Sequence, residues 1–391
     1  MITGERESFA VRVPQAAIDD LARRLDRTRW TDAVEGTGWE RGASVDYLRG
    51  LVEHWRTRFD WLAQERRINR WPHFRVPIDG LRIHFLHVPG KGPAPLPLVL
   101  THGWPGSFLE FEDLIPLLTE PDAHGADPRD AFEVIVPSIP GYGFSDRPRQ
   151  PGMSNAQVAE LWIALLEHLG HRRFGLQGGD WGAGISTWVA RREPSRVVGL
   201  HLNYIPGSYR PGLAPTSAPL SLAEEGFLES KRRWGEEEGA YGHLQATRPQ
   251  TLGIALNDSP AGLAAWIVEK LRGWSDCAGD VERRFGKDQI LTHVALYWFT
   301  ETIHSSMRLY LESARTPLQL GAGERIKPPT AVAVFPREAP SPPREWVERG
   351  YNLQRWTEMP SGGHFAAMEE PHRLAEDLRA FFRPLRDKVG R

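Results

Sequence analysis

The sequence predicts an α/β fold in which helices flank a mostly parallel central sheet. Three short apolar runs, each bounded by glycine or proline, are typical of buried parallel strands; they span residues 96–103, 132–141 and 174–180. A helical pattern over residues 155–170 separates the second run from the third. Strands that alternate with helices form sheets covered on both faces. A strand pattern at residues 329–336 resumes this alternation after a long interruption.

The composition indicates an ordinary globular protein. Of its 391 residues, 40% are hydrophobic and 25% are charged, and the length suits one large core with additions. Lysine and arginine number 48 against 50 aspartate and glutamate residues, so the charge favours neither nucleic acid nor an anionic membrane as a partner. The single cysteine, Cys277, excludes an internal disulfide, and the sequence shows neither a signal-peptide pattern nor an apolar span of about 18 residues. We expect a soluble, cytoplasmic protein that acts on a neutral small molecule.

The first 75 residues have the pattern of helices. Pro14 can open a helix whose apolar face carries Ile18, Leu21 and Leu25. Ser44 is a suitable N-cap for a second helix with the same apolar spacing. Neither segment alternates as a strand would.

The pattern changes to β-rich runs near residue 75. Asp79 and Gly80 separate two such runs, which predicts a hairpin. A much later stretch, rich in helix formers and tryptophan, interrupts the core after its sixth expected strand and is a candidate lid. The predicted segments are an N-terminal domain at 1–75, the first part of the core at 76–205, the helical lid at 206–325 and the second part of the core at 326–391.

Asp180 occupies the centre of a pattern typical of a nucleophile elbow. Gly178 and Gly182 flank it directly after a predicted strand, where hydrolases usually carry serine. Small neighbours allow a sharp strand-to-helix turn that lifts the central side chain above the sheet. An aspartate N-cap in a glycine-rich loop is the alternative interpretation, and this segment alone does not decide between them.

An aspartate nucleophile implies a different reaction from that of a serine. Serine attacking a saturated carbon would leave an ether, which water does not cleave. A carboxylate leaves an ester, which water can hydrolyse at its carbonyl carbon. An aspartate elbow therefore predicts attack on an epoxide or an alkyl halide. Asp180 must be ionised to attack; burial would raise its pKa, and a helix N-terminus and backbone N–H groups would oppose that shift.

A glycine-containing turn after the first core strand run is a candidate oxyanion hole. The segment HGWPGSFLEF at residues 102–111 could aim the Trp104 N–H at the elbow. The N–H of Trp181 would complete the hole for a tetrahedral intermediate. An ordinary strand-to-helix turn is the alternative, and the order of turn and elbow along the chain favours the oxyanion hole.

His364 is the candidate base, because it follows the last strand run in the order nucleophile, acid, base. Glu338, just past the strand at 329–336, is the best-placed acid to orient its ring. No spacing of histidines and carboxylates resembles a metal motif, so we expect neither a metal nor an organic cofactor. Three other glutamates compete as the acid: Glu358, Glu369 and Glu370. Two histidines in a predicted strand, His84 and His87, are interpreted as structural.

These motifs together resemble the epoxide hydrolases related to the microsomal and fungal enzymes. HGWPGS, SIPGYGFS, GGDWG and GGHFAAMEEP carry the resemblance in the core, and FAVRVPQAAIDDLARRLDRTRW is similar to the N-terminal domain of that group. The resemblance implies an α/β-hydrolase fold and the hydrolysis of an epoxide to a vicinal diol. It also implies that two lid tyrosines, Tyr241 and Tyr310, donate hydrogen bonds to the epoxide oxygen; a buried tyrosine with a satisfied hydroxyl is the alternative.

Two departures from the family pattern limit what is carried over. The membrane-anchoring helix of the microsomal enzymes is missing, so we expect no membrane anchor. Glu338 replaces aspartate and is one methylene longer. The expected partners are a small apolar epoxide and water, with a role in detoxification, and the N-terminal domain could mediate a homodimer.

Other functions share part of this pattern. A haloalkane dehalogenase uses the same aspartate nucleophile but binds halide through N–H groups and needs no tyrosine pair. A binding protein could retain the fold without turnover. A serine esterase is disfavoured because Ser186 lies in the helix after the elbow, away from the turn.

Overall fold

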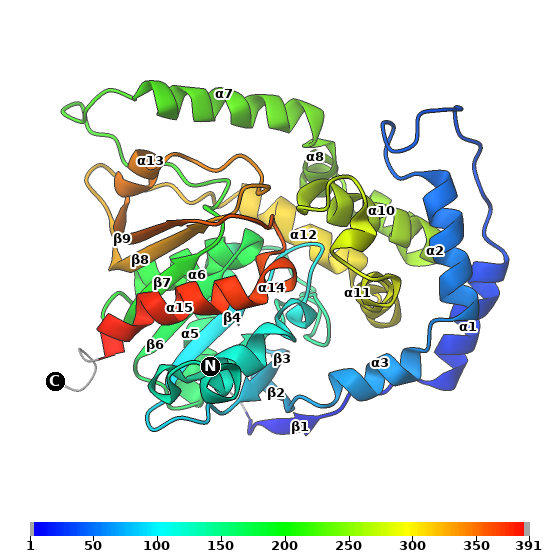
Figure 1. Cartoon of the computed structure of the whole chain (residues 1–391), viewed down its shortest axis with the longest axis horizontal. Coiled ribbons are helices and arrows are strands. Elements are labelled where there is room, and N and C mark those ends of the chain that lie inside the picture. The colour runs from blue at the N-terminus through cyan, green and yellow to red at the C-terminus, as the bar shows by residue number, and fades with distance from the viewer. Residues whose placement is uncertain (1–3, 387–391) are drawn as a thin grey trace.

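The computed structural model describes residues 4–386, and a nine-stranded sheet runs through them (Figure 1). The strand order is β1-β2-β3-β5-β4-β6-β7-β8-β9. Strands β4 to β9 pair in parallel, and β1, β2 and β3 join one edge in antiparallel pairs. The predicted α/β fold with a mostly parallel sheet is confirmed. The strands span Glu7–Phe9 (β1), His73–Ile78 (β2), Leu81–Val88 (β3), Leu96–Thr101 (β4), Phe132–Pro137 (β5), Phe174–Gly178 (β6), Val197–Leu202 (β7), Ile326–Val334 (β8) and Tyr351–Glu358 (β9).

The N-terminal segment differs from the purely helical expectation. It holds three helices, α1 (Gln15–Asp26), α2 (Val45–Thr57) and α3 (Trp61–Ile68), but it also holds β1, which pairs with β2. A strand of three residues is too short to show alternation in the sequence, and pairing with a distant strand stabilises it. Ser44 caps α2 as predicted, accepting a hydrogen bond from the Tyr47 N–H.

The predicted hairpin is present between β2 and β3. Ile78 pairs with Leu81, and both turn residues between them have positive φ, 48° at Asp79 and 77° at Gly80. Positive φ at both central positions is the geometry that suits the twist of a two-residue hairpin. Aspartate and glycine tolerate that geometry better than most residues.

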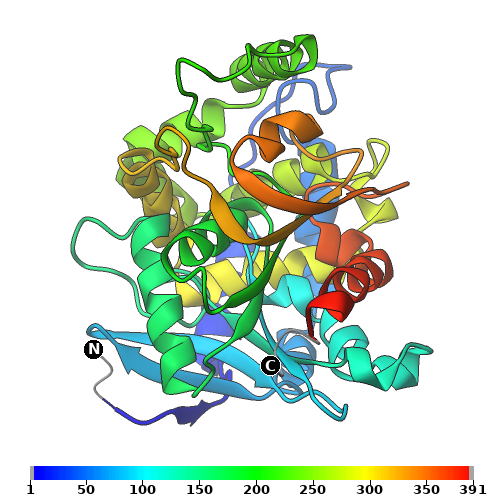
Figure 2. The ribbon, with the colours of Figure 1, turned by 90° about the vertical axis from the view of Figure 1, so that its left-hand side faces the viewer.

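Helices cover both faces of the sheet (Figure 2). On one face, α15 contacts β7 and β8, and α4 contacts both α15 and β5. On the other, α6 lies against β4, β6, β7 and β8 and is itself covered by α5. The core helices span Leu114–Thr119 (α4), Asn155–His168 (α5), Asp180–Arg192 (α6), Arg344–Glu348 (α13), Ala366–Glu369 (α14) and Pro371–Arg386 (α15).

A helical insertion separates β7 from β8. If the unexpected β1 is not counted, β7 is the sixth strand, which is where the sequence places the insertion. Helices α1 and α2 pack on α10, and α2 and α3 pack on α11, so the N-terminal segment and the insertion lie side by side (Figure 1). The insertion helices span Leu222–Glu237 (α7), Ala240–Thr247 (α8), Pro249–Asp258 (α9), Pro260–Trp274 (α10), Lys287–Thr300 (α11) and Ile303–Ala314 (α12).

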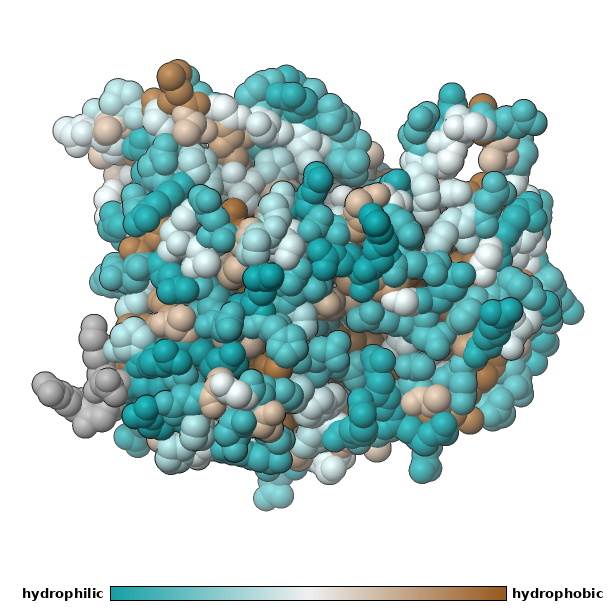
Figure 3. All heavy atoms as spheres, in the orientation of Figure 1, coloured by the Kyte–Doolittle hydropathy of each residue, from teal (hydrophilic) through white to brown (hydrophobic). Residues whose placement is uncertain are grey.

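The boundaries of the four predicted segments stay predictions. Their outer ends, residues 1–3 and 387–391, lie outside the described range. Within residues 4–386, no helix has both the length and the apolar character that crossing a bilayer requires. The face shown in Figure 3 is mainly hydrophilic, with apolar residues scattered over it.

Asp377 joins helix α15 to the sheet. Asp377 is buried, with 3% of its surface exposed. Its carboxylate accepts hydrogen bonds from two groups on β9, Arg355 Nε at 2.7 Å and Thr357 Oγ1 at 2.8 Å. It also lies 3.0 Å from His201 Nε2 on β7. Burial alone would raise the pKa of Asp377, but the hydrogen bonds and charges of His201 and Arg355 lower it well below its usual range. The network therefore depends on an ionised carboxylate.

We expect Asp377→Asn to lower the free energy of unfolding by about 2 to 3 kcal/mol, because hydrogen bonds to a buried charged group are lost. The effect is measured by urea denaturation at pH 7. Since the folded pKa is depressed, the stabilisation is present above the unfolded pKa of about 3.9 and is lost as the pH falls towards the folded value. Glu376→Gln, at an exposed position of the same helix, is the control; equal stability of the two variants would contradict this role for Asp377.

Candidate active site

Asp180 lies at a strained strand-to-helix turn between β6 and α6. Its φ is 45°, in the left-handed region that non-glycine residues rarely adopt. Gly179, not Asp180, is the N-cap of α6, and the Asp180 side chain makes no capping hydrogen bond. The N-cap interpretation of this segment is therefore wrong, and the turn has the geometry of a nucleophile elbow. Such strain costs about 1 to 3 kcal/mol and persists only where the surroundings enforce it.

The flanking glycines are required by close backbone approach. A Cβ on Gly182 would lie 1.8 Å from the carbonyl oxygen of Thr101, at the end of β4. A Cβ on Gly178 would lie 2.3 Å from the carbonyl oxygen of Gly182. Both distances are far below van der Waals contact, so a larger residue at either position would displace the elbow.

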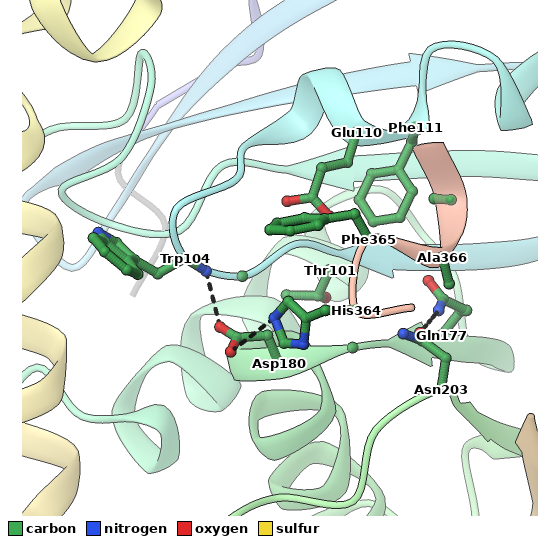
Figure 4. Close-up of a pocket in the computed structure, with 13 residues that line it drawn as sticks. Thr101, Trp104, Glu110, Phe111, Gln177, Asp180, Asn203, His364, Phe365 and Ala366 are labelled. Carbon is green, nitrogen blue, oxygen red and sulfur yellow. Dashed lines mark hydrogen bonds and ion pairs between the residues drawn. The ribbon is translucent and has the colours of Figure 1, made fainter. Parts of the chain in front are cut away.

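The Asp180 carboxylate is held from two sides (Figure 4). The Trp104 N–H donates a hydrogen bond to Oδ1 at 2.8 Å, and His364 Nε2 lies 3.4 Å from Oδ2. Gly103 permits this approach, because a Cβ there would lie 2.3 Å from the Asp180 Cβ. The amide of Trp181 follows Asp180 directly in the first turn of α6, and its indole ring packs on Tyr310.

The structure places Glu338, the predicted acid, behind the histidine. His364 Nδ1 lies 2.7 Å from Glu338 Oε1, and both side chains are buried. The loop after β8 carries Glu338, and the loop before α14 carries His364. The competing glutamates lie elsewhere: Glu358 is exposed at the end of β9, and Glu369 and Glu370 accept hydrogen bonds from other groups.

Two carboxylates control the charge of His364. Burial disfavours the charged ring, but Glu338 and Asp180 outweigh it through charge and hydrogen bonding and raise the pKa of His364 well above its ordinary value. The two neighbouring carboxylates therefore favour the charged form of His364. Neutralising Asp180 would remove one of the two groups that hold the proton there.

The two predicted tyrosines lie together over the elbow. Tyr241 on α8 and Tyr310 on α12 have ring centroids 5.9 Å apart. The Trp104 ring lies 5.5 Å from Tyr241 and 5.9 Å from Tyr310, and the Trp181 ring lies 4.5 Å from Tyr310. Burial, and after it the charge of Asp180, raises the pKa of Tyr241, and burial and the neighbouring Tyr241 raise that of Tyr310. Both hydroxyls stay protonated and can donate hydrogen bonds into the space above Asp180.

A small polar cavity lies on the other side of the nucleophile. Its volume is about 20 Å³, enough for a water molecule, and Asp180, His364, Glu110, Gln177 and Asn203 are among its lining residues (Figure 4). The Gln177 side-chain amide donates to the Asn203 side-chain oxygen at 2.8 Å, which fixes both.

Glu110 is the titratable residue of this cavity that the sequence interpretation missed, as it also missed Gln177 and Asn203. It lies in a short 3-10 helix, Phe108–Phe111, directly after the Trp104 turn. Burial raises the pKa of Glu110 to about 8; the charge of His364 opposes this shift, and that of Asp180 adds to it. The carboxyl group is therefore largely protonated at neutral pH. An acidic residue in an otherwise apolar segment, FLEF, was the available signal, but its burial beside Asp180 depends on tertiary packing.

Known proteins match this chain along most of its length. The model of the epoxide hydrolase N terminus matches residues 6–111, and that of the alpha/beta hydrolase fold matches residues 97–238. Epoxide hydrolase 1 of Oryctolagus cuniculus is 40% identical over 95% of this chain and 88% of its own length. The crystal structure of juvenile hormone epoxide hydrolase from Bombyx mori superimposes with a TM-score of 0.85 at 33% identity, covering 99% of this chain and 95% of its own. The Aspergillus niger epoxide hydrolase structure gives a TM-score of 0.84 at 29% identity, covering 98% and 97% of the two chains.

We expect Asp180→Asn to lower the pKa of His364, because one of the two carboxylates that stabilise the imidazolium is removed. The measurement is a pH titration of the histidine side chains by NMR, with the His364 signals assigned by their loss in His364→Gln. Asp19→Asn, at an exposed position on α1, should leave this pKa unchanged. An unchanged pKa in Asp180→Asn would show that Asp180 does not control the charge of the ring.

Proposed function

The chain belongs to the epoxide hydrolase family, and from this we propose that it converts an epoxide and water into a vicinal diol through a covalent ester on Asp180. One observation carries the proposal: a strained carboxylate lies between two protonated phenols on one side and a histidine with a water-sized cavity on the other. Each side supplies the groups that one half of such a reaction needs.

The first half is alkylation of Asp180. Oδ2 attacks a ring carbon of the epoxide, the carbon–oxygen bond of the ring breaks, and an ester forms while Oδ1 keeps the hydrogen bond from the Trp104 N–H. Tyr241 and Tyr310 donate hydrogen bonds to the epoxide oxygen as negative charge develops on it. One phenol passes its proton to the alkoxide, which becomes the first hydroxyl group of the diol.

The second half is hydrolysis of the ester. Esterification removes the charge of Asp180, so the pKa of His364 falls and the ring gives up a proton. This proton balances the one that the phenolate takes up. Neutral His364 then accepts a proton from water as the water oxygen attacks the Asp180 carbonyl carbon, and Glu338 stabilises the imidazolium that forms. The N–H groups of Trp104 and Trp181 stabilise the oxyanion. As the bond between Cγ and the substrate oxygen breaks, the leaving oxygen takes a proton from His364, which releases the diol, and His364 regains a proton from the new carboxylic acid of Asp180.

Glu110 positions the water in this scheme. A protonated carboxyl group can donate one hydrogen bond and accept another, so it can hold a water molecule without adding a second negative charge beside Asp180. Its place in the wall of the same small cavity as His364 and Asp180 supports this role. The attack on the ester thus comes from the face opposite the tyrosines.

The aromatic surroundings of the nucleophile favour an apolar epoxide. Four aromatic residues pack around the space above Asp180: Trp104, Trp181, Tyr241 and Tyr310.

Dehalogenation of an alkyl halide is the second candidate, because the indole N–H groups of Trp104 and Trp181 are buried without a hydrogen-bond partner and could hold a halide. The tyrosine pair and the named relatives support the epoxide. A homodimer and a cytoplasmic location stay predictions.

We expect His364→Gln to accumulate a covalent adduct, because alkylation of Asp180 continues while hydrolysis of the ester stops. Intact-mass analysis after exposure to an epoxide that the wild type hydrolyses should show a mass increase equal to that of the epoxide. Wild type should show little adduct at steady state, and Asp180→Ala none. The same proteins are offered 1-bromoalkanes; halide release without diol formation from epoxides would transfer the assignment to a dehalogenase.

We expect variants on opposite sides of Asp180 to slow different halves of the reaction. Tyr241→Phe or Tyr310→Phe should slow adduct formation by about 100-fold, and the double variant should abolish diol formation, because the epoxide oxygen loses its proton donors.

Glu110→Gln should leave adduct formation near the wild-type rate and slow hydrolysis of the ester by about tenfold, because one hydrogen bond to the attacking water is lost. Rapid quenching followed by mass analysis separates the two rates. Slower adduct formation in Glu110→Gln with unchanged hydrolysis would contradict its role.

A further inference from the structure

Three side chains outside the active site converge near the amino ends of strands β5 and β6: His87, Glu133 and His171. Glu133 Oε1 lies 2.5 Å from His87 Nε2 and 3.4 Å from His171 Nε2. One nitrogen from each ring and one carboxylate oxygen all lie within 4.8 Å of one another. We propose that these residues form a binding site for a divalent transition-metal ion, with Zn²⁺ as the best-suited example.

The donor set fits such an ion. Two imidazole nitrogens and one carboxylate oxygen are typical zinc ligands, which bind at about 2.0 to 2.2 Å in a roughly tetrahedral arrangement. That geometry places neighbouring ligand atoms about 3.3 Å apart, close to the 3.4 Å between Glu133 and His171. His87 must move away from Glu133 by less than about 1 Å, which a side-chain rotation provides. Water can fill the fourth position, because the three side chains are between 13% and 25% exposed.

The ligands come from segments that the sheet holds in place. His87 on β3 pairs with Ile135 on β5, and Glu133 lies two residues before Ile135, so the two side chains share one face of the sheet. His171 lies in the turn between α5 and β6. Among the described residues, His171 Nε2 is buried and has no hydrogen-bond partner, so this nitrogen is available to a metal ion.

Arg6 is the group that competes with a metal ion. Its Nη1 lies 3.0 Å from His87 Nδ1, and because a guanidinium only donates, Nδ1 accepts and the ring proton sits on Nε2. Metal binding at Nε2 requires this proton to move to Nδ1 and Arg6 to turn away. Arg6 is exposed, so the movement is open to it, but its charge and hydrogen bond weaken the site. Removal of Arg6 should therefore strengthen metal binding, whereas an ion-pair cluster with no metal function makes no such prediction.

The site lies away from the chemistry. Glu133 is near the amino end of β5 and His171 precedes β6, whereas Trp104 and Asp180 follow the carboxyl ends of the parallel strands β4 and β6. The two sites thus lie at opposite ends of the parallel strands. An ion bound there would cross-link β3, β5 and the turn after α5. It would affect the stability of the protein and not the reaction of Asp180.

The experiment titrates ZnCl₂, and separately CoCl₂, into the chelator-treated 391-residue chain at pH 7.5, with isothermal calorimetry and the thermal midpoint as readouts. The expected result is one ion per chain and a thermal midpoint that rises by a few degrees at saturating metal, by the linkage of binding to stability. Glu133→Gln and His171→Gln should each weaken binding at least about tenfold. Arg6→Gln should bind more tightly than the wild type, and His124→Gln, at an exposed position, should match the wild type.

Two results would overturn the proposal. Absence of saturable binding by the wild type would show that the cluster is an ion-pair network only. Binding that survives unchanged in both Glu133→Gln and His171→Gln would place the ion elsewhere on the chain. Circular dichroism of the metal-free variants shows whether each is folded, and the pair of substitutions keeps the test decisive if one variant fails to fold. Diol formation is not a readout, so the outcome is independent of the proposed reaction.

Discussion

The approach of the Asp180 elbow to the end of strand β4 is the constraint on which the site depends. Gly182 lies so close to the Thr101 carbonyl that no side chain fits between them, and this contact holds Asp180 in its left-handed conformation. The same β4 end continues into the turn that supplies the Trp104 N–H. One backbone contact therefore sets both the strain at the nucleophile and its distance from the hydrogen-bond donor that stabilises it. The strain is supported by the parallel pairing of β4 with β6, in the middle of the sheet.

Electrostatics then divides the site into two sides. On one side, burial and the charge of Asp180 keep the phenols of Tyr241 and Tyr310 protonated. On the other, the same charge, together with Glu338, keeps a proton on His364. Asp180 therefore controls the protonation of the groups around it, and Asp180 loses its own charge when the proposed ester forms. In the proposed sequence of steps, ester formation itself converts His364 from a cation into a base, without any movement of the chain.

Most of the core and the chemically reactive residues could be predicted from the sequence because their signals are local. Apolar runs bounded by glycine or proline indicated β4, β5 and β6, and the glycines around Asp180 indicated the turn that follows β6. The features that escaped prediction depend on contacts between distant segments. Strand β1 has three residues and exists through its pairing with β2. The position of Glu110 depends on the packing of its short helix against α14, which follows His364 in the chain.

Histidines show the same limit most clearly. His84 and His87 lie three residues apart on β3, and the sequence interpretation treated both as structural. His84 is fully buried, where it contacts the Ser138 hydroxyl and the His73 ring. His87 lies beside Glu133 and His171, which are 46 and 84 residues away along the chain. No linear motif joins residues at such separations, so a ligand set of this kind is visible only once the sheet and the turn after α5 have brought it together. The absence of a metal motif in a sequence is therefore weak evidence about sites that a sheet assembles.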